Sequence, residues 1–181
     1  PSLDQALIAL ATAYDLPAVE LQVANAAHLP AMGTRGGRIA LNAGLFPVPA
    51  YKPSTGYKVD RALLLAFMRQ ESKFQPDATS WAGARGLMQI MPATASHITQ
   101  DRSLARGNRD KLLDPTFNLT LGQDYLTELM GSGEPYGNLF MLTTAYNGGP
   151  GNLSRWLASM DFKGDPFLFI DSIPAAETRG Y

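Results

Sequence analysis

The chain has 181 residues, of which 45% are hydrophobic and 17% are charged, and this composition excludes a disordered tail. A net charge of −1 and an isoelectric point near 6.1 provide no broad basic surface, which argues against nucleic acid or an anionic membrane as the main partner. The chain contains no cysteine, so a disulfide framework and thiol catalysis are excluded.

Neither a membrane span nor a signal peptide is visible in the sequence. The longest unbroken apolar run, residues 62–68, is far shorter than the roughly 20 residues that a membrane-spanning helix needs. The first residues lack the basic region and the long apolar core of a signal peptide. If the protein is exported, we expect this chain to be a processed or truncated form.

Two short helical runs open the chain, at residues 4–15 and 17–28, and Pro17 suits the first turn of the second. They predict a helical hairpin. Residues 30–58 follow, and their density of glycine and proline predicts an extended connector with at most one short helix. The expected domains are therefore 1–57, the hairpin with its connector, and 58–181.

The next predicted helix begins after Asp60, a good N-cap, and carries Glu71 near its end. Four apolar residues precede Glu71 at helical spacing and share its face: Leu63, Leu64, Phe67 and Met68. We therefore expect Glu71 to point inward, where lost hydration raises the pKa of its carboxyl group and suits it to general acid catalysis. The alternative is a glutamate that reaches water or pairs with Arg69 or Lys73.

A glycine-rich turn and a mixed apolar and polar run follow this helix. Gly83 and Gly86 allow backbone conformations closed to other residues and a close approach by a ligand. Gln89 is a neutral donor and acceptor among hydrophobic residues, which suits hydroxyl or acetamido groups, although its amide can also be satisfied by nearby backbone. Pro92 fits the first position of another helix.

The rest of the chain is predicted to be helical. Asp114 caps and Pro115 opens one helix, residues 139–147 form the next, and another begins near Pro150. Short strand pieces that could form a small sheet are expected around residues 99–109. The architecture is therefore mainly α.

Three motifs, in order, resemble those of the soluble lytic transglycosylase family, and together they extend from about residue 60 to the end of the chain. The first comprises Glu71–Ser72, Ser80, Gly83–Ala84, the run GLMQIMP at 86–92, and Thr94–Ala95; the second is AYNGG at 145–149; the third is Ile173–Pro174 with Glu177–Arg179 and Tyr181.

This resemblance implies a lysozyme-like catalytic domain, similar to goose-type lysozyme, with a small or vestigial β element and a preceding helical hairpin. It also implies a bacterial periplasmic location. In the family such hairpins end a longer helical superstructure, which would make residue 1 an internal cut. The other interpretation, a complete small protein with an N-terminal cap, stays open. The chain ends within the third motif, where we expect truncation or disorder.

The resemblance also implies functional residues. Glu71 would be the catalytic acid, and six residues would bind the substrate: Ser80, Gln89, Met91, Tyr146, Asn147 and Glu177.

The residues themselves allow more ordinary interpretations. Ser80 can be a turn former, and Tyr146 a buried, hydrogen-bonded core tyrosine. Glu177 can form a local ion pair with Arg179. Trp81 can be a sugar-stacking platform or simply a loop aromatic, and Met91, with Met88, can pack in the core or line a cleft floor.

No cofactor or metal is expected, because His28 and His97 are isolated and lack carboxylate or cysteine neighbours at ligand spacing. Most glycoside hydrolases use two carboxylates, but the first motif supplies Glu71 alone, without Asp77 or Asp101. The resemblance implies a lyase that cleaves the β-1,4 bond between N-acetylmuramic acid and N-acetylglucosamine in peptidoglycan strands without water, leaving 1,6-anhydro ends. A hydrolytic muramidase and a non-catalytic glycan-binding module remain the alternatives.

Overall fold

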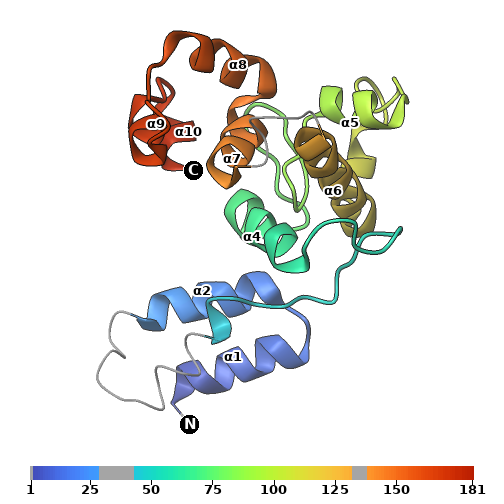
Figure 1. Ribbon diagram of the computed structural model, residues 1–181. Helices are drawn as coiled ribbons and strands as arrows, with labels where there is room; N and C mark the ends of the chain where they lie inside the picture. The colour runs from blue at the N-terminus through green and yellow to red at the C-terminus, as the bar shows by residue number, and fades with distance from the viewer. Residues whose placement is uncertain (1, 29–42, 132–137) are drawn as a thin grey trace. The chain divides into compact units, whose positions relative to one another are not determined.

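The computed structural model describes residues 2–28, 43–131 and 138–181 (Figure 1). The chain forms two compact units, Pro1–Thr120 and Leu121–Tyr181, and the boundary falls within a helix. The domain division expected at residues 57 and 58 stays a prediction. Among the described residues, no helix combines the length and the apolar character needed to cross a membrane.

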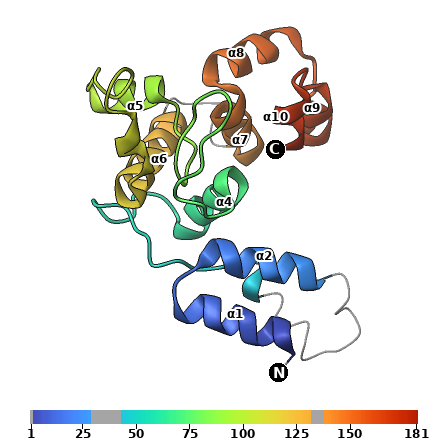
Figure 2. The same cartoon turned by 180° about the vertical axis from the view of Figure 1, so that it is seen from behind.

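The predicted helical hairpin is confirmed. Helices α1 (Leu3–Ala13) and α2 (Pro17–His28) lie side by side, as Figures 1 and 2 both show. Ser2 caps α1, since its hydroxyl accepts the backbone N–H of Gln5 at 3.3 Å and the Gln5 side chain accepts the backbone N–H of Ser2. A small apolar core joins the two helices: Ile8, Ala24 and Ala27, with Val23 and Leu45 packed against them. The first part of the predicted connector, residues 30–42, lies outside the described residues.

Helix α4 (Arg61–Ser72) begins where the sequence predicts it. The Asp60 carboxylate accepts the backbone N–H of Leu63 at 3.1 Å, which satisfies one of the donors that the first turn leaves open. The predicted apolar stripe is buried at three of its four positions, Leu64, Phe67 and Met68, while Leu63 is half-buried. Packing of this face therefore holds α4 in the unit.

The segment between α4 and α5 (Pro92–Thr99) contains the β structure of the described chain, and it amounts to two isolated antiparallel bridges. Arg85 takes part in both, with Thr79 and with Ile90. The β element is thus vestigial, as expected. Pro92 occupies the first turn of α5, where its missing N–H costs nothing.

The strand pieces expected around residues 99–109 are wrong. All of these residues are described: Thr99 is the last residue of α5, residues 102–107 form turns, and Arg109 begins a short 3₁₀ helix, η1 (Arg109–Leu113). Asp101 accepts the backbone N–H of Ser103 at 2.9 Å, and the Ser103 carbonyl accepts the N–H of Asn108 at 3.0 Å. These local hydrogen bonds engage the groups that a strand would have offered to a neighbour.

Helix α6 (Pro115–Gly131) follows η1, and the Asp114 carboxylate accepts the N–H of Phe117 at 2.7 Å, which confirms the predicted cap. The second unit continues with short helices, and within it α7 packs against both α8 and α10. Gly149 separates α7 from α8 at a φ of 86°, a conformation that favours glycine. The bounds are α7 (Leu139–Gly148), α8 (Pro150–Ser159), α9 (Pro166–Ser172) and α10 (Ala176–Gly180).

Candidate active site

Glu71 lies in the last turn of α4 and is half-buried. The residues three, four and seven positions before it are Met68, Phe67 and Leu64, with 0%, 3% and 1% of their surface exposed. Because these positions share a helix face with Glu71, their packing fixes the orientation of the turn that carries the carboxylate. Glu71 is thus held by the core yet retains access to a ligand.

The contacts of Arg69, one of the two partners considered for Glu71, lie elsewhere. Its Nε donates to the Leu45 carbonyl at 3.0 Å, and its guanidinium lies 5.3 Å from the centre of the Phe46 ring. Both contacts direct Arg69 to the segment before α4. Lys73, the other candidate partner, is exposed and forms the left-handed C-cap of α4.

The chain reverses direction sharply after α4. Lys73 and Phe74 have φ values of 52° and 65°, in the left-handed region that costs a residue other than glycine about 1–2 kcal/mol. Phe74 is only 2% exposed, and burying a phenylalanine contributes about 1.5–3 kcal/mol. Burial of this ring therefore offsets the backbone strain and fixes where the loop leaves α4. The segment from α4 to α5 lies beside α4 in both views (Figures 1 and 2).

A buried asparagine on α6, Asn118, holds this loop from behind. Its Oδ1 accepts the backbone N–H of Met88 at 2.7 Å, and its Nδ2 donates to the carbonyls of Arg85 and Leu112, both at 2.8 Å. Asn118 is 0% exposed, so these three bonds replace the water that its amide loses. These bonds therefore fix the backbone of the loop against α6.

Gln89 uses its amide nitrogen to brace the same loop. Its Nε2 donates to the carbonyls of Ala78 at 3.1 Å and of Gly86 at 2.9 Å, and its own φ is 45°. The sequence left open whether nearby backbone satisfies this amide. Both of its N–H groups do bond to backbone carbonyls. The Oε1 atom remains the acceptor that a ligand hydroxyl or N–H can use.

Ser80 is a turn former. Its Oγ accepts the backbone N–H of Ala84 at 3.0 Å, and its carbonyl accepts the N–H of Gly83, also at 3.0 Å. The Ser80 hydroxyl proton stays available to a ligand, because the bond to Ala84 uses an oxygen lone pair. Trp81, next in the turn, is 99% exposed.

The two methionines of the first motif separate. Met88 is fully buried and belongs to the core, whereas Met91, the N-cap residue of α5, is 40% exposed. A flexible thioether at the surface can adapt to the shape of a ligand. Of the two positions considered for these methionines, Met88 therefore lies in the core and Met91 is accessible to a ligand.

In the second unit, the second and third motifs meet. The Thr178 hydroxyl of α10 donates to Asn147 Oδ1 on α7 at 2.7 Å. A side chain at Gly148 would meet Thr178 Cγ2 at 3.2 Å, so glycine lets the two helices approach closely. Tyr146 is half-buried, and its ring lies 5.4 Å from that of Tyr125, centre to centre. The second and third motifs thus pack directly against each other.

Glu177 is exposed on α10. The Arg179 guanidinium donates to the Ile173 carbonyl at 3.1 Å, and within the described chain no ion pair joins it to Glu177. The local ion pair considered for Glu177 is therefore not formed, and its carboxylate faces solvent.

The aspartates considered as water activators differ in setting. Asp77 is exposed, whereas Asp101 is half-buried and bonded to Ser103. Hydrogen bonds from the side chain and backbone of Ser103, with a smaller effect of Lys111, hold the pKa of Asp101 below its ordinary value. A depressed pKa makes Asp101 a weaker base near neutral pH.

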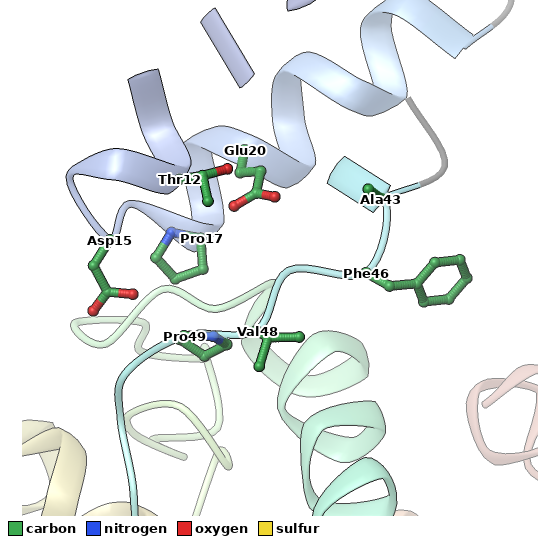
Figure 3. A pocket seen from close by; sticks show the side chains of 8 residues that line it. All are labelled: Thr12, Asp15, Pro17, Glu20, Ala43, Phe46, Val48 and Pro49. Atoms are coloured by element: carbon green, nitrogen blue, oxygen red, sulfur yellow. The ribbon is translucent and has the colours of Figure 1, made fainter. Parts of the chain in front are cut away.

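A cavity of about 560 Å³ lies between the hairpin and the connector, away from these residues in sequence (Figure 3). The figure shows Glu20 next to Thr12 at this cavity. Burial raises the pKa of Glu20, the Thr12 hydroxyl lowers it in part, and the charge of Asp15 raises it further. The lining residues are Thr12, Asp15, Pro17, Glu20, Ala43, Phe46, Val48 and Pro49.

The candidate residues thus fall in two sets, one per unit. The first unit holds Glu71, Ser80, Gln89 and Met91, and the second holds Tyr146, Asn147 and Glu177. In the described part of the chain, no three histidine, aspartate or glutamate residues gather in a way that could hold a metal ion. The first set combines one carboxylate with neutral hydrogen-bonding groups on a braced loop, which suits a polyhydroxylated neutral ligand.

Sequence reasoning missed Asn118. A lone asparagine among the apolar positions of the helix after Pro115 indicated only that a buried amide there would need partners, and the sequence did not show which residues supply them.

The chain matches the family model described as the transglycosylase SLT domain over residues 49–166. It is 38% identical over 130 residues to the soluble lytic murein transglycosylase of Escherichia coli strain K12, covering 71% of this chain and 20% of that protein. It is 38% identical over 127 residues to membrane-bound lytic murein transglycosylase C of Glaesserella parasuis, covering 66% of this chain and 34% of that protein. The chain thus spans about a fifth to a third of these relatives.

Solved structures agree with these matches. The 70-kDa soluble lytic transglycosylase of Escherichia coli superposes with a TM-score of 0.75 at 32% identity, covering 98% of this chain and 28% of that one. The complex of a 70-kDa soluble lytic transglycosylase with bulgecin A gives a TM-score of 0.76 at 32% identity and the same coverage. The mainly α, lysozyme-like fold expected from the sequence is confirmed.

Proposed function

Because the chain belongs to the transglycosylase SLT domain family, we propose that it is a lytic transglycosylase of peptidoglycan. The bond cleaved is the β-1,4 link between N-acetylmuramic acid and N-acetylglucosamine, and the product ends in 1,6-anhydro-muramic acid. The observation that carries this proposal is the family match across the segment that contains Glu71, its braced loop and the end of α7. The relatives' printed names, lytic murein transglycosylase, support the same reaction.

Glu71 is the acid in this proposal. Its half-buried position at the end of a packed helix meets the two requirements of a general acid: a fixed orientation and access to the substrate. Glu71 gives its proton to the glycosidic oxygen as the bond from that oxygen to C1 breaks. The leaving N-acetylglucosamine departs with a free hydroxyl group.

The same carboxylate then serves as the base. The 6-hydroxyl oxygen of the muramic acid attacks C1, and its proton passes to Glu71, which restores the acid for the next turnover. A new intramolecular bond replaces the broken one, so no water is consumed. A single carboxylate is sufficient for this route, whereas a hydrolase of the usual kind needs two.

The loop supplies binding and orientation. Gln89 Oε1 accepts from a sugar hydroxyl or acetamido N–H, the Ser80 hydroxyl donates, and the exposed Met91 thioether contacts the ring. The bonds from Asn118 and Gln89 that brace the loop support this role, because a prepositioned site loses less entropy when ligand binds.

Three residues of the second unit also belong to the proposal. Following the family resemblance, we assign Tyr146, Asn147 and Glu177 to binding of the glycan strand. Support comes from the direct bond between Asn147 and Thr178, which ties the second and third motifs into one rigid piece. We also propose that residues 58–181 form the catalytic domain, and that the protein acts in the periplasm.

The nearest rival is a muramidase on the same fold, in which an aspartate activates water. The bonds from Ser103 that depress the pKa of Asp101 disfavour that residue as the base. A second rival, a glycan-binding module, predicts no cleavage at all.

Substitution of Glu71 tests the proposal. Glu71→Gln keeps the shape of the side chain but removes its ionisable proton, so turnover of glycan strands should fall by at least about 10³-fold while binding survives. The matched control is Glu128→Gln, the same change at an exposed glutamate of α6, which should leave turnover intact. Unchanged turnover in Glu71→Gln would refute the assigned role.

A further inference from the structure

Trp81 has the most exposed large apolar side chain in the described part of the chain, at 99%. An exposed indole gains nothing from the core, and its apolar surface is left in water. The residues that follow it, Ala82 and Gly83, are small, and a side chain at Gly83 would meet nothing within 4 Å. Both faces of the ring are therefore open to a ligand.

The backbone that carries Trp81 is nevertheless fixed. The Gly83 N–H donates to the Ser80 carbonyl at 3.0 Å, and the Ser80 N–H donates to the Ala84 carbonyl at 2.9 Å. The Ala84 N–H donates to Ser80 Oγ, and the bridge from Thr79 to Arg85 closes the turn. Only the two side-chain torsions of Trp81 must be restricted on binding, which costs little entropy.

We propose that Trp81 is a sugar-stacking residue, whose indole face packs against the apolar face of a pyranose ring of the glycan strand, away from the bond that is cleaved. This inference rests on the proposed function and extends it to a specific contact. Trp81 belongs to the same braced segment as Gln89, between Glu71 and α5, so the turn that presents it is part of the proposed substrate-binding loop. Nothing in the fold itself requires an aromatic residue there.

The surroundings favour a sugar over a protein or a lipid surface. Between residues 75 and 90, all described, Trp81 is the only exposed large hydrophobic residue, so the turn itself presents one apolar side chain and not the cluster of them that a protein interface uses. A membrane surface would require a basic cluster, but the nearby Arg85 is bound to Asp110 at 2.7 Å. One aromatic face is, by contrast, matched in size to one sugar ring.

Binding is measured by calorimetry in the Glu71→Gln background, with uncross-linked N-acetylglucosamine–N-acetylmuramic acid oligomers as the probe. Trp81→Ala should weaken affinity about tenfold, a loss within the range of one stacking contact. Trp81→Phe should remain within about threefold of the parent, because it keeps a planar ring. Tyr14→Ala is the matched control, an aromatic residue 71% exposed at the end of α1, and it should bind unchanged.

Three further readouts separate stacking from a structural role. The melting temperature of Trp81→Ala should equal that of the parent, because the side chain is 99% exposed. In the enzyme that retains Glu71, Trp81→Ala should raise KM about tenfold and leave kcat within about twofold, as expected when a contact is equal in ground and transition states. The indole emission shift on binding should disappear in Trp81→Phe, although Trp156 remains.

Unchanged affinity and KM in Trp81→Ala, in a chain that cleaves glycan, would overturn the stacking role and leave the proposed function intact. A Trp81→Phe variant as weak as Trp81→Ala would also overturn it. Failure of the wild-type chain to cleave, together with failure of Glu71→Gln to bind, would overturn the proposed function and this inference with it.

Discussion

The side-chain amide of Asn118 occupies the place that a side chain at Gly86 would need. A Cβ at Gly86 would lie 2.5 Å from Asn118 Nδ2 and 2.3 Å from the Leu112 carbonyl oxygen, distances that real Cβ atoms do not reach. Gly86 also has a φ of 78°. The glycine therefore allows α6 and η1 to support the candidate active-site loop from directly behind it.

Gly86→Ala is expected to destabilise the protein by about 3 kcal/mol, from the steric clash together with a left-handed conformation that alanine disfavours. Turnover should fall as well, since the loop that carries Gln89 must move. Urea unfolding and glycan cleavage measure the two effects. Gly107→Ala is the matched control, because a side chain there meets nothing within 4 Å and its φ is not positive. Equal stability of the two variants would contradict this account.

Asn118→Asp tests the hydrogen bonds that brace the loop without changing the size of the side chain. The variant would turn an oxygen toward the carbonyls of Arg85 and Leu112, where Nδ2 now donates. Loss of both bonds at a fully buried site should cost about 3 kcal/mol or more. The same change at the exposed Asn25 of α2 serves as control and should be nearly neutral. Comparable unfolding midpoints for the two variants would exclude a bracing role for Asn118.

Glu20 predicts a pH dependence in the hairpin. Burial raises the pKa of its carboxyl group in the folded protein, so the folded state binds the proton more tightly than the unfolded chain does. The stability from this group is complete below the unfolded pKa and is lost as the pH rises through the folded pKa. Glu20→Gln should therefore stabilise the protein at about pH 7 and lose that advantage near pH 4.

Urea unfolding of both proteins at the two pH values measures this effect. The exposed carboxylate of Asp161, replaced by asparagine, is the control and should give no such crossover. A gain for Glu20→Gln that is equal at both pH values would mean that ionisation of Glu20 is not the cause.

The helices that flank the site could be predicted because their signals are local. Asp60 as a cap and the stripe from Leu64 to Met68 define α4, and Pro92 marks the start of α5. Burial of that stripe could be predicted from its period alone. The three motifs, in their order, also identified the family. That identification came from their resemblance to known motifs and not from a geometric argument.

The prediction of strands at residues 99–109 was wrong because hydrogen bonds from side chains determine the backbone conformation of that segment. Asp101 and Ser103 bond to neighbouring backbone, and this local bonding replaces the pairing that a strand needs. The role of Asn118 depends on contacts with residues about 30 positions away in the chain, such as Met88. No local pattern contains that information.

The products of cleavage test the central claim most directly. Purified peptidoglycan glycan strands are digested with this protein, and mass spectrometry determines the form of the new muramic acid ends. Our account predicts 1,6-anhydro ends, lighter by one water than reducing ends, because Glu71 passes the proton between two oxygens of the substrate. Reducing ends would contradict it, since they would show that water, and a second base to activate it, takes part.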